Sequence, residues 1–137
     1  MRYFIDTNIL IFIVMDPDLL TKEVKDILDD SSNLIYVPSK CVEELIYLQQ
    51  SKKIGIKRWK TADDVLDYIK EFGFGIKYVA EEHLRTLARL PLFPDHKDQT
   101  DRVIIAQAIT EKMPIISSDR KFQDYRRHGL NLVFNRR

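Results

Sequence analysis

The sequence predicts a single α/β domain built on a mainly parallel central sheet of about five strands, with helices on both faces. Two observations lead to this prediction. Short apolar runs typical of buried strands alternate along the chain with segments of helical period. No repeat, low-complexity tract or Pro/Gly/Ser-rich linker divides the 137 residues, so residues 1–137 are expected to form one domain.

The predicted elements follow one another in strand–helix order. Strands are expected at residues 2–6, 33–37, 75–80, 114–118 and 130–134. Helices are expected at residues 20–30, 39–51, 61–71, 81–89, 99–112 and 119–127. In a sheet of this kind the ligand crevice lies outside the carboxyl ends of the strands. Asp6, which ends the first strand, is therefore expected at the crevice.

The bulk composition is that of a soluble globular protein, with 45% hydrophobic and 31% charged residues. No apolar run approaches the roughly 20 residues of a membrane-spanning helix, and no signal peptide is evident, so no membrane association is expected. Cys41 is the single cysteine and cannot form an intrachain disulfide, which favours the cytoplasm.

The formal net charge is only +1, but the basic residues are unevenly distributed. One cluster contains Lys52, Lys53, Lys57, Arg58 and Lys60, and a second contains Arg126, Arg127, Arg136 and Arg137. Taken alone, each cluster is most simply explained as solvated surface charge.

Functional acids are expected at the carboxyl ends of predicted strands and on the inward faces of the helices that follow. Asp6 and Asp119 each follow a strand, although either could instead cap a helix. Asp101 falls within the apolar stripe of its helix, where an uncompensated carboxylate is costly. Its place in the first helical turn lowers that cost.

Three further acids lie in or next to predicted helices. Glu44 flanks the apolar face of helix 39–51, whereas Glu43 points towards solvent, so Glu44 is preferred; a slip of one residue would exchange them. Asp98 is expected to be the N-cap of the helix that carries Asp101.

Four carboxylates in one pocket would repel strongly, and divalent cations supply the missing charge. Oxygen ligands suit Mg²⁺ or Mn²⁺. Zinc is disfavoured because His83, His96 and His128 are scattered and a thiolate cluster is absent. The sequence therefore predicts metal-dependent hydrolysis of a phosphodiester. Signatures of serine hydrolases, P-loop proteins, zinc proteases and dinucleotide-binding proteins are not found.

Four segments together resemble the successive motifs of the PIN-domain family, most closely the VapC-type toxins of toxin–antitoxin pairs. They are "FIDTNIL" at 4–10, "VPSKCVEELIYL" at 37–48, "DQTDRVIIAQAI" at 98–109 and "PIISSDRKFQDY" at 114–125. The resemblance implies a Mg²⁺- or Mn²⁺-dependent endoribonuclease that forms a homodimer and is inhibited by a cognate antitoxin. By position, the family's acids fall on Asp6, Glu44, Asp101 and Asp119, the same four that the pattern selects.

The resemblance also suggests supporting roles for other residues. Ser117 would orient the site or contact a phosphate, and Asn8 would orient Asp6 through a hydrogen bond. In the resulting hypothesis, the four acids hold one or two ions, and a metal-activated water attacks RNA. Arg102 and the cluster Lys52, Lys53, Lys57 and Arg58 are the candidates for guiding its phosphates.

Three alternatives to this hypothesis remain. A catalytically silent PIN-like module could bind RNA or protein only. An aspartyl phosphotransferase normally carries a second Asp where this chain has Asn8, and a phospho-receiver domain needs paired acids after its first strand. The sequence does not specify which RNA is cleaved.

Overall fold

The computed structural model describes residues 1–96 and 98–137. Its five-stranded sheet has the order β3-β2-β1-β4-β5, and every pair of neighbouring strands is parallel. The strands are β1 (Arg2–Ile5), β2 (Leu34–Pro38), β3 (Gly75–Lys77), β4 (Ile115–Ser117) and β5 (Leu132–Phe134). The predicted α/β class with a parallel sheet is confirmed.

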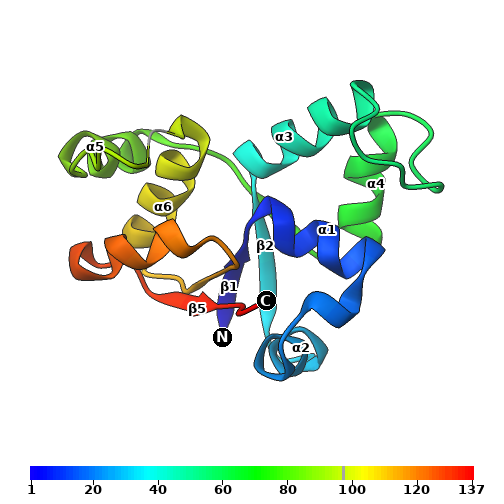
Figure 1. Ribbon diagram of the computed structural model, residues 1–137, viewed down its shortest axis with the longest axis horizontal. Coiled ribbons are helices and arrows are strands. Elements are labelled where there is room, and N and C mark those ends of the chain that lie inside the picture. The colour runs from blue at the N-terminus through cyan, green and yellow to red at the C-terminus, as the bar shows by residue number, and fades with distance from the viewer. Residues whose placement is uncertain (97) are drawn as a thin grey trace.

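The connections between strands place helices on both faces of the sheet. The chain proceeds from β1 through β2 to β3, passing through α1 (Thr7–Met15), η1 (Pro17–Leu19), α2 (Lys22–Asp29), α3 (Ser39–Gln50) and α4 (Asp63–Glu71). It then returns to the other side of β1, passing through α5 (Glu81–Arg89), α6 (Gln99–Glu111) and the 3₁₀ segment η2 (Arg120–His128). Parallel connections are right-handed, so this reversal puts the second group on the opposite face, as Figure 1 shows.

The reversal creates a switch point between β1 and β4. Connections leave these two neighbouring strands in opposite directions, which opens a crevice beyond their carboxyl ends. Both strands are central and apolar, and Phe4, Ile5, Ile115 and Ile116 are fully buried. The core thus fixes the positions from which Asp6 and Asp119 emerge.

Three elements differ from the sequence-based prediction. Helix α1 was not predicted, because its sequence TNILIFIVM is apolar nearly throughout and lacks the polar face that reveals a helical period. The strand expected at 75–80 ends at Lys77. The helix expected at 119–127 is a 3₁₀ segment. None of the helices in the described ranges combines the length and apolar character needed to cross a bilayer.

Candidate active site

Asp6 lies immediately beyond β1 and is held in place from two sides. Its Oδ1 accepts the backbone N–H of Ile9 at 3.1 Å, which makes Asp6 the N-cap of α1. Its Oδ2 accepts the hydroxyl of Ser117. Burial, with a smaller contribution from the charges of Asp101 and Asp119, raises the pKa of Asp6 to about 7 despite the lowering effect of these hydrogen bonds. Asp6 is thus a buried acid close to two others.

Ser117 joins two of the candidate acids. This fully buried residue ends β4, and its Oγ also accepts the backbone N–H of Asp119 at 3.0 Å. Asp119 in turn accepts the N–H of Lys121 at 2.9 Å and caps η2. Both Asp6 and Asp119 therefore cap helices while their carboxylates remain at the carboxyl ends of adjacent strands.

Asp101 reaches the site from the first turn of α6. Asp98 is the N-cap of this helix, as predicted, and accepts the Asp101 N–H at 3.0 Å. Burial raises the pKa of Asp101 to about 6, and the charges of Asp98 and Asp119 act in the same direction. The hydrogen bond with His96 opposes this rise.

His96 is a site residue that the sequence analysis missed. Its side chain is 2% exposed, and its Nε2 lies 3.2 Å from Asp101 Oδ2. Its Nδ1 lies 2.8 Å from the hydroxyl of Tyr125. Ligand atoms of His96, Asp101 and Asp119 all lie within 4.8 Å of one another. The pattern H-x₄-D was the available signal, but a histidine in a loop has no period that reveals where its ring points.

The two adjacent glutamates of α3 have different surroundings. Glu43 is exposed and forms an ion pair with Lys40 at 3.5 Å. Glu44 is half-buried. Burial raises the pKa of the nearby Cys41 thiol, and the charges of Asp6, Glu44 and Asp101 add to that rise. Glu44 is therefore the glutamate whose charge acts on the same buried region as the aspartates.

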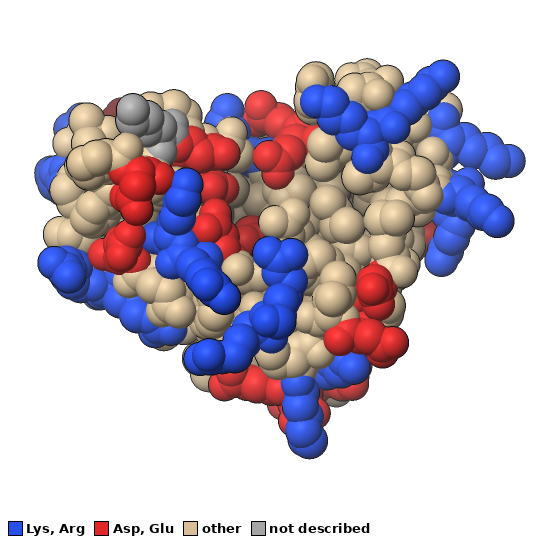
Figure 2. All heavy atoms as spheres, in the orientation of Figure 1, with Lys and Arg blue, Asp and Glu red and all other residues tan. Residues whose placement is uncertain are grey.

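The pocket as a whole is acidic. Figure 2 shows acidic side chains on both sides of a hollow in the upper middle of the molecule, where α3 and α6 face each other in Figure 1. Ionised carboxylates in such a place need a compensating cation, because burial and mutual repulsion disfavour their charged forms and raise the pKa values of Asp6 and Asp101. The carboxylate oxygens of the aspartates suit Mg²⁺ or Mn²⁺, whereas both ring nitrogens of His96 are already bonded, to Tyr125 and Asp101.

Two residues that were predicted to support the site, Arg102 and Asn8, do not make the predicted contacts. Arg102 is 5% exposed and donates to the carbonyl oxygens of Pro91 at 2.8 Å and Leu90 at 3.3 Å. The prediction that it contacts RNA is therefore wrong, because its guanidinium is buried against the backbone that follows α5. Asn8 is exposed, and the hydrogen bonds to Asp6 come from Ile9 and Ser117 instead.

The basic cluster at residues 52–60 lies in the loop between α3 and α4. Lys52, Lys53, Lys57 and Arg58 are all exposed. Lys53 and Arg58 each lie 5.2 Å from the ring centre of a tyrosine, Tyr47 and Tyr68 respectively. This loop is at the outer edge of the molecule, away from the end of β1 (Figure 1).

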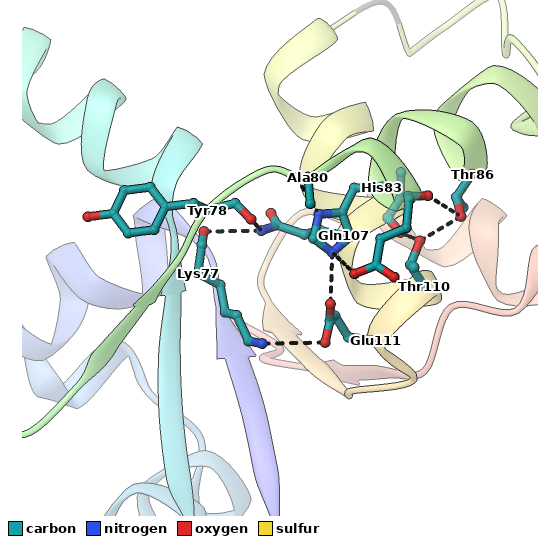
Figure 3. A network of polar contacts seen from close by, with 10 residues as sticks. Lys77, Tyr78, Ala80, His83, Thr86, Gln107, Thr110 and Glu111 are labelled. Atoms are coloured by element: carbon teal, nitrogen blue, oxygen red, sulfur yellow. Dashed lines mark hydrogen bonds and ion pairs between the residues drawn. The ribbon is translucent and has the colours of Figure 1, made fainter.

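A second group of metal-ligand types, Glu82, His83 and Glu111, has a structural role (Figure 3). His83 Nδ1 accepts the N–H of Ala80 at 2.8 Å, so its Nε2–H donates to Glu111 at 2.8 Å. Both ring nitrogens are thus occupied. Gln107 meanwhile donates to the carbonyl oxygens of Lys77 and Tyr78, which explains why β3 ends there.

These features define a parallel α/β domain with an acidic pocket at the switch point of its sheet. The model of the PIN domain family matches residues 3–128. The chain belongs to this family, as the sequence motifs predicted.

Three solved structures share this fold. VapBC2 from Rickettsia felis, bound to a promoter DNA fragment, has a TM-score of 0.70 and 18% identity, with 98% of each chain covered. VapBC-1 from nontypeable Haemophilus influenzae has a TM-score of 0.66 and 16% identity, also with 98% of each chain covered. DNA-bound VapBC from Salmonella typhimurium has a TM-score of 0.67 and 14% identity, with 99% of each covered. A comparison with curated proteins gives no match.

Proposed function

We propose that this protein is a divalent-metal-dependent endoribonuclease and the toxin of a toxin–antitoxin pair. The observation that carries the proposal is the meeting of acids from distant parts of the chain: Ser117 bonds both the Asp6 carboxylate and the Asp119 N–H, and carboxylate oxygens of Asp101 and Asp119 lie within 4.8 Å of each other. Asp101 and Asp119 raise the pKa of Asp6, and Glu44 acts with Asp6 and Asp101 on the pKa of the same buried thiol. A buried group of carboxylates in a PIN domain supports metal-dependent phosphodiester hydrolysis.

The proposed roles follow from the surroundings of each residue. Asp6, Glu44, Asp101 and Asp119 would hold one or two Mg²⁺ or Mn²⁺ ions. Such an ion would polarise the phosphodiester and lower the pKa of an attacking water. The carboxylates would accept the proton of this water. Ser117 would fix the orientation of Asp6, because its hydroxyl leaves that carboxylate little freedom to rotate.

The proposal extends to partners and location. The similar solved structures carry the name VapBC, which supports a cognate antitoxin that covers the site. We also propose a homodimer and a cytoplasmic location, the latter in keeping with the buried free thiol of Cys41. The exposed loop cations Lys52, Lys53, Lys57 and Arg58 are proposed as an outer surface for RNA.

The test is cleavage of cellular RNA in the presence of Mg²⁺ or Mn²⁺, with EDTA as the metal-free control. Asp6→Asn retains a side chain that can cap α1 but removes the charge, so we expect it to abolish metal-dependent cleavage while circular dichroism stays unchanged. Full cleavage by this variant would overturn the proposed site.

The adjacent glutamates provide a matched pair for the same assay. Glu44→Gln is expected to lower cleavage by about 10–100-fold, the typical cost of disturbing a metal site. Glu43→Gln removes an equal charge from the exposed face of α3 and is expected to retain full activity. The reverse result would assign the ligand role to Glu43.

A further inference from the structure

A groove of about 740 Å³ opens beside the acidic pocket, and Asp119 lies in its wall. Four basic residues line it: Arg120 and Lys121 from the start of η2, and Arg136 and Arg137 from the segment after β5. We refer to it as the basic groove. The sequence offered no reason to group these residues, because 14 positions separate Lys121 from the next member. The return of the chain through β5 brings the two pairs together.

The cations of the basic groove are available to a ligand. All four are exposed, and none takes part in an ion pair among the described residues. Arg137 lies over the ring of Phe12 at 5.6 Å, which orients its guanidinium without neutralising it. Asp119 is the one acid in the lining. In a protein whose formal net charge is +1, this is a local excess of positive charge.

Asn135 joins the segments that line the groove by hydrogen bonds. Asn135 is fully buried, and its Nδ2 donates to the carbonyl oxygen of Leu19 at 2.9 Å and to Ser118 Oγ at 2.8 Å. Its Oδ1 accepts the N–H of Thr21 at 2.7 Å. Asn135, which precedes Arg136, is thereby hydrogen-bonded to Ser118, which precedes Asp119. The backbone segment that carries Arg136 and Arg137 is thus joined directly to the segment that carries Asp119 and Arg120.

We propose that the basic groove holds the phosphates of a single-stranded RNA on the segment next to the scissile bond. This inference rests on the proposed nuclease function. Unpaired arginines and lysines are the usual partners of phosphate oxygens. Phe134, which is half-buried in the lining, offers a ring on which a base can stack, and the exposed amide of Asn8 can form hydrogen bonds with the strand. A single strand is required because stacking needs an unpaired base.

The experiment measures binding without cleavage. A short fluorescein-labelled single-stranded RNA is titrated with protein in EDTA, and anisotropy is followed over a series of salt concentrations. The double variant Arg120→Gln/Arg136→Gln is expected to bind about tenfold more weakly or worse. The slope of log K against log salt should also fall by about 0.7 for each phosphate that the variant no longer neutralises. Phe134→Leu should weaken binding and leave that slope unchanged.

Two control variants remove the same charge elsewhere. Lys70→Gln/Arg89→Gln alters exposed residues of α4 and α5 and is expected to bind like the unmodified protein. Lys52→Gln/Lys53→Gln tests the outer loop and is expected to have the smaller effect. Unchanged binding by the groove variant, or a greater loss of affinity with either control, would overturn the proposal. Competition by an oligoglutamate as strong as that by RNA would also overturn it and would identify a surface for an acidic peptide.

The result can be separated from the outcome for the nuclease function, because EDTA prevents hydrolysis. If the protein binds RNA through the basic groove but does not cleave RNA when metal is present, the nuclease proposal fails and the proposal of RNA binding by the groove is retained. If the protein cleaves RNA but the groove variants bind normally, only the groove proposal fails.

Discussion

Asp6 serves the fold and the candidate site with one side chain. One carboxylate oxygen caps α1 and the other accepts the hydroxyl of Ser117 from the neighbouring strand, so a local and a distant contact together hold the side chain. The same burial makes its ionised form unfavourable, and its pKa rises to about 7. The position is therefore one where the requirements of folding and those of metal binding oppose each other.

The raised pKa of Asp6 predicts how stability depends on pH in the metal-free protein. The Asp6 carboxyl has a pKa of about 7 in the folded protein and an ordinary value of 3.8, which we take for the unfolded chain. The folded state therefore binds this proton more tightly than the unfolded state does. This contribution to stability is complete at low pH and is lost as pH rises from about 4 to about 7, a change on the order of 4 kcal/mol. Asp6→Asn should therefore raise the unfolding temperature in EDTA most at about pH 8, less at about pH 5, and little at about pH 4.

Differential scanning fluorimetry in EDTA and in Mn²⁺ checks this prediction. Mn²⁺ should raise the unfolding temperature of the unmodified protein more than that of Asp6→Asn, because binding to the folded state alone stabilises it. An Asp6→Asn variant that is less stable than the unmodified protein at the higher pH would contradict the account.

His96 is expected to position Asp101. The ring lies between the Tyr125 hydroxyl and the Asp101 carboxylate, so it fixes which oxygen of Asp101 remains free. His96→Asn should weaken Mn²⁺ binding by about 10–100-fold in isothermal titration calorimetry. His128→Asn changes an exposed histidine and should leave the affinity unchanged. Equal affinities in the two variants would mean that the ring serves packing alone.

At the scale of elements, helices α5 and α6 are joined by a polar network. Glu111 accepts from His83 at 2.8 Å and lies 3.5 Å from the Lys77 ammonium group. The hydrogen bond from His83 and the charge of Lys77 lower the pKa of Glu111. Thr110 of α6 donates to Thr86 of α5 in the same region. This network fastens the C-terminal end of α6, the helix that carries Asp101 in its first turn, to α5.

Removal of Glu111 should therefore cost stability. We expect Glu111→Ala to lower the free energy of unfolding by about 1–3 kcal/mol, because the buried His83 loses its acceptor. Glu82→Ala is the matched control, since Glu82 is mainly exposed and lies 3.9 Å from the same ring. Urea denaturation measures both, and equal losses of stability would show that the His83–Glu111 bond contributes little.

At the scale of the whole molecule, the fold and the acidic residues were largely predictable. The parallel sheet follows from alternating strand and helix patterns, and Asp6 and Asp119 stand at strand ends that are visible in the sequence. The inward position of Asp101 follows from the period of α6. These features are local, so a sequence pattern is enough to reveal them.

What escaped prediction depends on the packing of distant segments against one another. The orientation of His96 is set by Tyr125, 29 residues further along the chain. The burial of Arg102 depends on carbonyl groups at the end of α5, and the basic groove depends on the return of β5 to β4. Neither periodicity nor composition carries such information. Helix α1 was not predicted for a different, local reason, because a nearly uniform apolar segment has no helical period to detect.

The buried amide of Asn135 has a consequence for the divergence of this protein. It serves Leu19, Thr21 and Ser118 at once, as a donor to two of them and an acceptor from the third. An isosteric aspartate would keep the bond from Thr21 but supply no donor to Leu19 and would bury a charge, and a leucine would lose all three hydrogen bonds. Mutational drift at this position is therefore confined more narrowly than at the exposed arginines that follow it.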